Sequence, residues 1–336
     1  MIKDNTLVCP VCNSRDVREL FETKSLAVIR HLSSLNNRNT KELIRQKIEA
    51  LWKADHASYF RCRECTFEFA HPFVAADPGF YDLVYHSEIQ YPADKWEYLI
   101  TSGSVQKFIH DFPISPRLLE IGAGNGSFLK LVAAIIPMGD IFATEYSGSG
   151  AKSISQMGIT CYQYDLQQIS EAHLHGKISI VCMFQVLEHM TNLHELFEKL
   201  RILTLPGSRF YISVPNNHHR QFFDRFNRHY DLPPVHVGRY NDLCMVRLAE
   251  AHGWKLLQHA IQPTGYKERI LKFIFSEYAA GQSVFDPEKV KLRVLRLLLR
   301  YGMLTLLVVF HLRIVIGLRD PKLGIAQWFE LERANN

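Results

Sequence analysis

The sequence lacks a segment long and apolar enough to cross a membrane. Its most apolar uncharged run extends from Met303 to Phe310, which is far shorter than the roughly 20 apolar residues of a spanning helix. Polar residues follow Met1 almost at once, so no secretory signal is expected. We therefore expect a cytoplasmic protein, in which disulfides are rare.

Strong charge of one sign, internal repeats and low-complexity tracts are also missing. The chain has 39 Lys and Arg against 34 Asp and Glu, with a formal net charge of +5 at pH 7. This mild excess is well short of the basic tail of a nucleic-acid-binding protein. With 47% hydrophobic and 22% charged residues over 336 positions, the composition argues against a disordered chain and predicts a packed fold of about two domains.

Cysteine occurs seven times, and four of the cysteines form two Cys-x-x-Cys pairs. The pairs are Cys9 with Cys12 and Cys62 with Cys65. In a reducing compartment they predict a structural zinc site with four thiolate ligands, and redox dithiols or unliganded pairs are the alternatives. The pairs lie further apart than the usual roughly 15 to 20 residues, and a helical pattern over about residues 25–54 explains the separation.

Further along the chain, short apolar runs alternate with helical patterns, which is typical of a parallel sheet with crossover helices. The expected strands cover residues 117–121, 140–145, 160–163, 178–184, 208–214, 256–261 and 324–331. We predict an α/β fold with a seven-stranded, doubly wound, Rossmann-like sheet. The expected domains are a zinc ribbon with a helical insert (1–75), an aromatic linker (76–98) and the sheet domain (99–336), with a helical insert at about 266–320.

A glycine-rich turn follows the first of these strands, in the sequence Glu-Ile-Gly-Ala-Gly-Asn-Gly over residues 120–126. Gly122, Gly124 and Gly126 have no Cβ that would hinder a tight turn or the close approach of a cofactor. The motif alone is a weak signal, because nicotinamide cofactors and plain structural turns share it. Two acids at the ends of the next strands add to it. Glu145 is expected to bind a ribose diol, and Asp165 either accepts from an adenine amine or caps a helix.

These motifs together resemble those of the class I S-adenosylmethionine (SAM)-dependent methyltransferases, over about residues 100–260 and the last strand. The resemblance rests on the glycine turn, Glu145, Asp165, Val-Leu-Glu-His-Met at 186–190, and the segment 203–216, where Ser208 replaces a glycine. It implies SAM as cofactor. The implied cofactor-binding residues are Glu120, Gly122, Gly124, Gly126, Glu145, Asp165 and Gln185.

Two histidines are the candidate catalytic residues. The loop 230–240 is similar to the Pro-Pro-His-His-x-x-Arg-(Trp/Tyr) segment of bacterial methyltransferases in glycan, antibiotic-sugar and cell-surface pathways. Val235 stands at the first histidine, so the resemblance carries over only His236, as general base. A structural hydrogen bond is the alternative for His236. His189 belongs to the Leu-Glu-His triplet, and an ordering role for the helix that this triplet begins is the alternative for His189.

A zinc ribbon joined to a SAM domain through an aromatic linker also looks like the sugar C-methyltransferases of deoxysugar pathways. We expect a small-molecule or glycan acceptor, such as a sugar intermediate of bacterial surface polysaccharide or secondary metabolism. An RNA methyltransferase and a non-catalytic scaffold are the alternatives. The basic and then apolar segment 289–318 fits a peripheral contact with the cytoplasmic face of a membrane, a homodimer contact, or a helix that covers the protein's own core.

Overall fold

The computed structural model describes residues 7–32, 38–84, 92, 94–111, 115–163, 166, 169, 174–226, 228–229, 231–282 and 312–335. The chain forms two compact units. The first comprises Met1–Ala260 together with Ala326–Asn336, and the second comprises Ile261–Ile325.

The first unit contains a seven-stranded sheet in the order β10-β11-β8-β7-β4-β5-β6. Its strands are β4 (Leu118–Ile121), β5 (Ile141–Thr144), β6 (Thr160–Tyr162), β7 (Ile178–Phe184), β8 (Thr204–Pro215), β10 (Trp254–Ile261) and β11 (Ala326–Arg333). β4, β5, β6, β7 and β8 form parallel pairs, and β11 is antiparallel to β8. The predicted doubly wound, seven-stranded fold class is confirmed.

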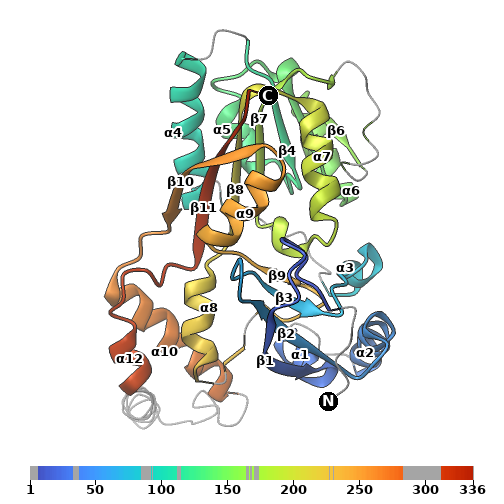
Figure 1. The fold of residues 1–336 in the computed structure, drawn as a ribbon, viewed down its shortest axis with the longest axis vertical. Coiled ribbons are helices and arrows are strands. Elements are labelled where there is room, and N and C mark those ends of the chain that lie inside the picture. The colour runs from blue at the N-terminus through green and yellow to red at the C-terminus, as the bar shows by residue number, and fades with distance from the viewer. Residues whose placement is uncertain are drawn as a thin grey trace, which may run out of the picture. The chain divides into compact units, whose positions relative to one another are not determined.

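Residues of the central strands alternate between the two faces of this sheet, because side chains of a strand point to opposite sides. Leu119, Val181 and Ile212 belong to one buried cluster with residues of α7 (Leu193–Leu203) and α9 (Asp242–Ala251). Leu118 and Ile180 belong to a second cluster with residues of α4 (Trp96–Asp111) and α5 (Ser127–Val132). Figure 1 shows these helices around the sheet. The two clusters place the core on both faces.

A smaller sheet in the same unit holds the cysteine pairs, and Figure 1 shows it below the large sheet. Its strands run in the order β1 (Val17–Lys24), β2 (His56–Cys62), β3 (Glu68–His71) and β9 (Gly238–Arg239). Helices α1 (Ser25–His31) and α2 (Arg38–Trp52) separate β1 from β2, and α3 (Pro78–Val84) follows β3. Ile44, Ile48 and Trp52 of α2 are buried in one cluster with α3 residues. The fourth strand, β9, comes from the loop that carries His236.

The second unit contains α10 (Tyr266–Gln282) and α12 (Leu312–Gly317). The Arg269 guanidinium donates to the carbonyl of Leu318 over 2.8 Å, and the Tyr266 hydroxyl donates to the carbonyl of Val315 over 3.3 Å. Most of the segment 289–318 lies outside the described residues. Among the helices that are described, none is long and apolar enough to span a membrane.

Candidate functional site

The glycine turn lies at the carboxyl end of β4, with all three glycines at positive φ. Gly122, Gly124 and Gly126 have φ values of 69°, 57° and 76°, which side chains other than glycine rarely adopt. A Cβ on Gly122 would lie 2.6 Å from Cγ2 of Val186. The turn therefore packs directly against the loop that follows β7, and no larger residue fits at Gly122.

Glu145 follows β5 and faces the same turn. Its carboxylate accepts hydrogen bonds from the backbone N–H of Gly124 over 2.7 Å and of Ser147 over 2.8 Å. Gly150, in α6 (Gly148–Gln156), also packs closely against the turn. A Cβ on Gly150 would lie 2.5 Å from the carbonyl oxygen of Gly124. The sequence analysis did not single out Gly150 as a site residue. The sequence signal for it is its position shortly after β5.

Glu120 is buried in β4, immediately before the turn. Glu120 is 2% exposed, and one of its carboxylate oxygens has no hydrogen-bond partner among the described residues. Burial, and then repulsion from Glu145, raise the pKa of Glu120 well above its usual value. A buried acid without a full set of partners is costly, so this oxygen is free to meet a donor group of a bound ligand.

Gln185 occupies a strained position directly after β7. Its φ is 57°, a conformation that a non-glycine residue adopts only when the surroundings impose it. Its backbone N–H donates to the carbonyl of Ser213 over 2.8 Å. This places Gln185 at the carboxyl ends of parallel strands, where ligands bind in doubly wound folds. Asp165, the other predicted cofactor ligand, lies outside the described residues.

Glu188 and His189 form the short 3-10 helix η4 (Leu187–His189) just beyond Gln185. Glu188 is 1% exposed, and neither of its carboxylate oxygens has a hydrogen-bond partner among the described residues. Burial raises its pKa to about 7, with His236 opposing the shift. Burial, and then the neighbouring His236, lower the pKa of His189 to about 3, so the imidazole of His189 is neutral at physiological pH.

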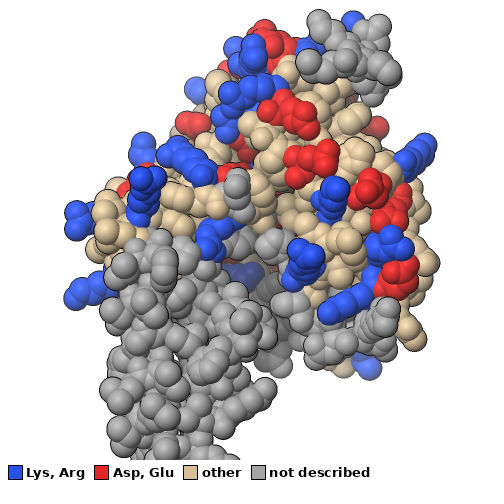
Figure 2. Space-filling view, turned by 90° about the horizontal axis from the view of Figure 1, so that it is seen from below, with Lys and Arg blue, Asp and Glu red and all other residues tan. Residues whose placement is uncertain are grey.

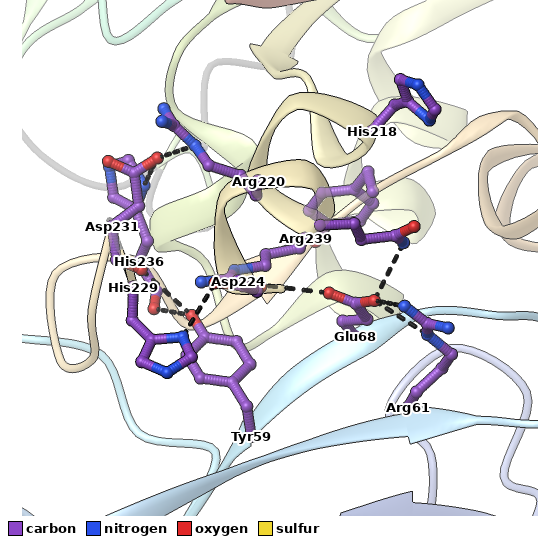
Figure 3. Close-up of polar contacts among 12 residues, drawn as sticks. Tyr59, Arg61, Glu68, His218, Arg220, Asp224, His229, Asp231, His236 and Arg239 are labelled. Carbon is purple, nitrogen blue, oxygen red and sulfur yellow. Dashed lines mark hydrogen bonds and ion pairs between the residues drawn. The ribbon is translucent and has the colours of Figure 1, made fainter. Parts of the chain in front are cut away.

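His236 lies against His189, with the two rings edge to face and their centroids 4.6 Å apart. Its Nδ1 is 3.6 Å from a carboxylate oxygen of Asp231, which also pairs with Arg220 (Figure 3). Burial opposes ionisation of Asp231, but Arg220 and His236 hold its pKa well below the usual range. The structure therefore brings the predicted catalytic residues together. It adds Asp231 and Arg220, which the sequence analysis did not single out, and Glu188, which belongs to the Leu-Glu-His triplet but was not predicted as a site residue.

The small sheet holds the His236 loop in place through buried polar contacts (Figure 3). The Tyr59 hydroxyl on β2 donates to the carbonyl of His236 over 2.5 Å. Arg239 on β9 is 4% exposed; it donates to Asp224 over 2.6 Å and lies 3.7 Å from Glu68 of β3. The Arg239 guanidinium also stacks over the Tyr59 ring, 4.5 Å from its centroid. This arrangement couples the packing of β2 and β3 to the position of His236.

The four paired cysteines form one cluster beside the small sheet, where Cys9 and Cys12 precede β1, Cys62 ends β2 and Cys65 lies between β2 and β3. Cys9 and Cys65 have their sulfur atoms 3.5 Å apart, as do Cys12 and Cys62, and all four sulfurs lie within 4.8 Å of one another. A tetrahedral zinc ion with Zn–S bonds of about 2.3 Å would place its sulfurs roughly 3.8 Å apart. The cluster therefore fits a four-thiolate zinc site, and every ligand belongs to the protein.

The seven-stranded sheet with a glycine turn after its first parallel strand defines a class of nucleotide-cofactor enzymes. A family model described as "Methyltransferase domain" matches residues 68–259, which is more than half of the chain. The chain belongs to this family. It is a SAM-dependent methyltransferase.

Solved structures give weaker similarities. A SAM-dependent methyltransferase from Archaeoglobus fulgidus is 13% identical, with 70% of this chain and 93% of that chain covered and a TM-score of 0.43. Magnesium protoporphyrin IX methyltransferase from Synechocystis PCC 6803 with bound SAH is 12% identical, with coverage of 74% and 91% and a TM-score of 0.42. A search of curated proteins finds no match.

Proposed function

We propose that this methyltransferase acts on a hydroxyl-bearing small molecule or glycan, such as a sugar intermediate of bacterial surface polysaccharide or secondary metabolism. The observation that carries the proposal is the continuous contact from the glycine turn through Val186 to Glu188, His189 and His236. It joins a site suited to the methyl donor with a compact group of titratable side chains.

In this proposal the methyl donor occupies the glycine turn. Glu145 gives up its backbone contacts to bind the ribose, Asp165 lies at the adenine, and Glu120 and Gln185 flank the methionine part. Bound SAM supplies a methyl group whose bond to sulfur breaks, with its electron pair left on sulfur, as an acceptor oxygen forms the new bond to carbon. The chain's own part is to orient the acceptor and promote loss of its proton.

His236 and His189 are the proposed acceptor-side catalytic residues. Asp231 faces Nδ1 of His236, which leaves Nε2 for the acceptor. The small sheet with its four-cysteine zinc site has a structural role, because Tyr59 and Arg239 fix the backbone on both sides of this histidine. The assignment to a sugar pathway also rests on two resemblances described above. The His236 loop is similar to a segment of bacterial glycan and antibiotic-sugar methyltransferases, and the ribbon looks like that of the deoxysugar C-methyltransferases.

The distribution of charge on one face of the protein supports a small acceptor over a long polyanion. On the face shown in Figure 2, basic and acidic side chains of the described residues are interspersed. Incubation with labelled SAM and sugar nucleotides, glycolipid extracts or RNA tests the acceptor class. Label found in the sugar or glycolipid fractions supports the proposal, and label found only in RNA would refute it.

Replacing Gly150 with alanine is expected to weaken SAM binding at least tenfold. The new Cβ would lie 2.5 Å from the carbonyl oxygen of Gly124 and 2.9 Å from Cγ of Glu145, so the turn and the ribose-binding acid must move. Calorimetric titration with SAM measures the change. Gly139→Ala is the matched control, because nothing lies within 4 Å of a Cβ there. Equal affinities of the two variants would show that the turn does not hold SAM.

Replacing His236 with alanine is expected to lower kcat about a hundredfold or more, the range expected for loss of a proton-transfer group. Steady-state rates on the acceptor found with labelled SAM measure the effect. The affinity for SAM, measured by calorimetry, should not change. His110→Ala is the control, because the side chain of His110 is 88% exposed near the end of α4. An unchanged kcat would remove His236 from the proposed mechanism.

A further inference from the structure

Glu188, His189 and His236 have the composition and spacing of a metal site. One ligand atom from each residue lies within 4.8 Å of the others, and the carboxylate of Glu188 is 3.9 Å from Nε2 of His189. Glu188 is 99% buried with both oxygens lacking hydrogen-bond partners among the described residues. A buried carboxylate with no partner is costly unless a cation or a donor meets it.

Both imidazoles have a polar group facing their Nδ1 atoms. Nδ1 of His189 lies 2.6 Å from the carbonyl oxygen of Val235. A carbonyl only accepts, so Nδ1 carries the proton and Nε2 keeps a free lone pair. Nδ1 of His236 faces Asp231 at 3.6 Å. Metal-binding histidines typically donate their second N–H to a carbonyl or carboxylate in this way.

The two histidines of the cluster are partly exposed, whereas its carboxylate is not. The side chain of His189 is 28% exposed and that of His236 is 16% exposed, whereas Glu188 is buried beneath them. Three protein ligands leave coordination positions for further oxygen atoms. Arg220 is a cationic side chain close enough to act on Glu188, and its ion pair with Asp231 offsets this positive charge.

We propose that Glu188, His189 and His236 bind a divalent first-row transition metal ion. Two imidazole nitrogens with one carboxylate favour such ions over Mg²⁺ or Ca²⁺, which prefer all-oxygen sites. This site is distinct from the four-cysteine cluster, whose sulfurs lie beside the small sheet.

The inference also specifies the acceptor, and in this part it rests on the proposed function. A cation with open positions binds an acceptor through two neighbouring oxygens, such as a vicinal diol or a hydroxyl beside a carboxylate. It lowers the pKa of the hydroxyl that it contacts. The proton of that hydroxyl would pass to water, and the oxygen lone pair would form the bond to the methyl carbon as the methyl–sulfur bond of SAM breaks and its electron pair stays on sulfur. His189 and His236 thus act on the acceptor as ligands of the cation.

Cobalt(II) titration of the full-length protein, with the cysteine cluster first filled by one equivalent of zinc, tests the site. We expect a second metal equivalent that gives weak visible bands without the intense sulfur charge-transfer absorption of a thiolate site. Glu188→Gln and His236→Gln should each weaken this binding at least tenfold. Asp231→Asn should weaken it about 10- to 100-fold, as expected for a group that orients a ligand. His110→Gln, the matched exposed histidine, should bind cobalt like the unaltered protein.

The proposal would be overturned if the unaltered protein bound no second equivalent of metal. It would also be overturned if folded Glu188→Gln and His236→Gln both retained this second equivalent in full. Thermal melting of each variant identifies those that are folded. His236→Gln is expected to fold, because it changes a partly exposed loop residue. SAM calorimetry on the same preparations separates this failure from failure of the proposed function. Normal SAM binding without the second metal would leave the methyltransferase site intact and His236 as a direct base.

Discussion

Replacement of both Cys62 and Cys65 by serine is expected to unfold the small sheet and to abolish methyl transfer. The four sulfurs lie within 4.8 Å of one another, and structural zinc in zinc-finger peptides contributes about 10 to 16 kcal/mol of apparent binding free energy at neutral pH. Three of the four cysteines are fully buried in the same cluster as Phe67 and Phe69. Loss of two ligands therefore removes both the metal and the packing around it.

Metal analysis, limited proteolysis and SAM calorimetry together measure this effect. The bound zinc should fall by one equivalent, and residues 7–71 should become sensitive to protease. SAM binding should weaken less than catalysis, because the glycine turn belongs to the large sheet whereas Tyr59 and Arg239 position the His236 loop. Cys161→Ser, a half-buried cysteine outside the cluster, is the control. A double variant that keeps its zinc and its protease resistance would contradict a zinc-dependent fold.

Local sequence patterns were sufficient to predict the large sheet. The apolar run at 178–184 became β7 with unchanged bounds, and the run at 117–121 became β4 (Leu118–Ile121). These patterns report burial on both faces of a parallel strand. The glycines at 122, 124 and 126 were predictable for the same reason, because their positive φ values are a property of the local turn.

Features that depend on distant segments could not be predicted. β9 pairs Gly238 and Arg239 with β3, about 170 residues earlier in the chain, and two residues carry no strand pattern. The sequence likewise gives no sign that Glu188 is buried without hydrogen-bond partners among the described residues. The burial of Glu188 depends on a distant segment, because the backbone N–H of Val237 donates to the Glu188 carbonyl. The role of Asp165, which lies outside the described residues, stays a prediction.

Replacing Arg239 with methionine is expected to destabilise the first unit by about 3 to 5 kcal/mol, as is typical when one partner of a buried ion pair is removed. The guanidinium is 4% exposed; it donates to Asp224 and stacks over Tyr59. Methionine matches its length and apolar stem but leaves the partly buried Asp224 carboxylate paired with His229 and without its guanidinium partner. Because Arg239 also pairs β9 with β3, the His236 loop should loosen together with the core.

Chemical denaturation of Arg239→Met measures this loss, and Arg201→Met is the control, because Arg201 pairs with Glu198 on the exposed side of α7, where ion pairs contribute little. The double variant Arg239→Met with Asp224→Asn identifies the cause. Removal of the unpaired charge should restore part of the stability if burial of an uncompensated carboxylate is the main cost. An additive further loss would instead assign the cost to lost packing over Tyr59. In either case, the stability of the small sheet and the position of His236 should change together, because Arg239 stacks on Tyr59, whose hydroxyl donates to the His236 carbonyl.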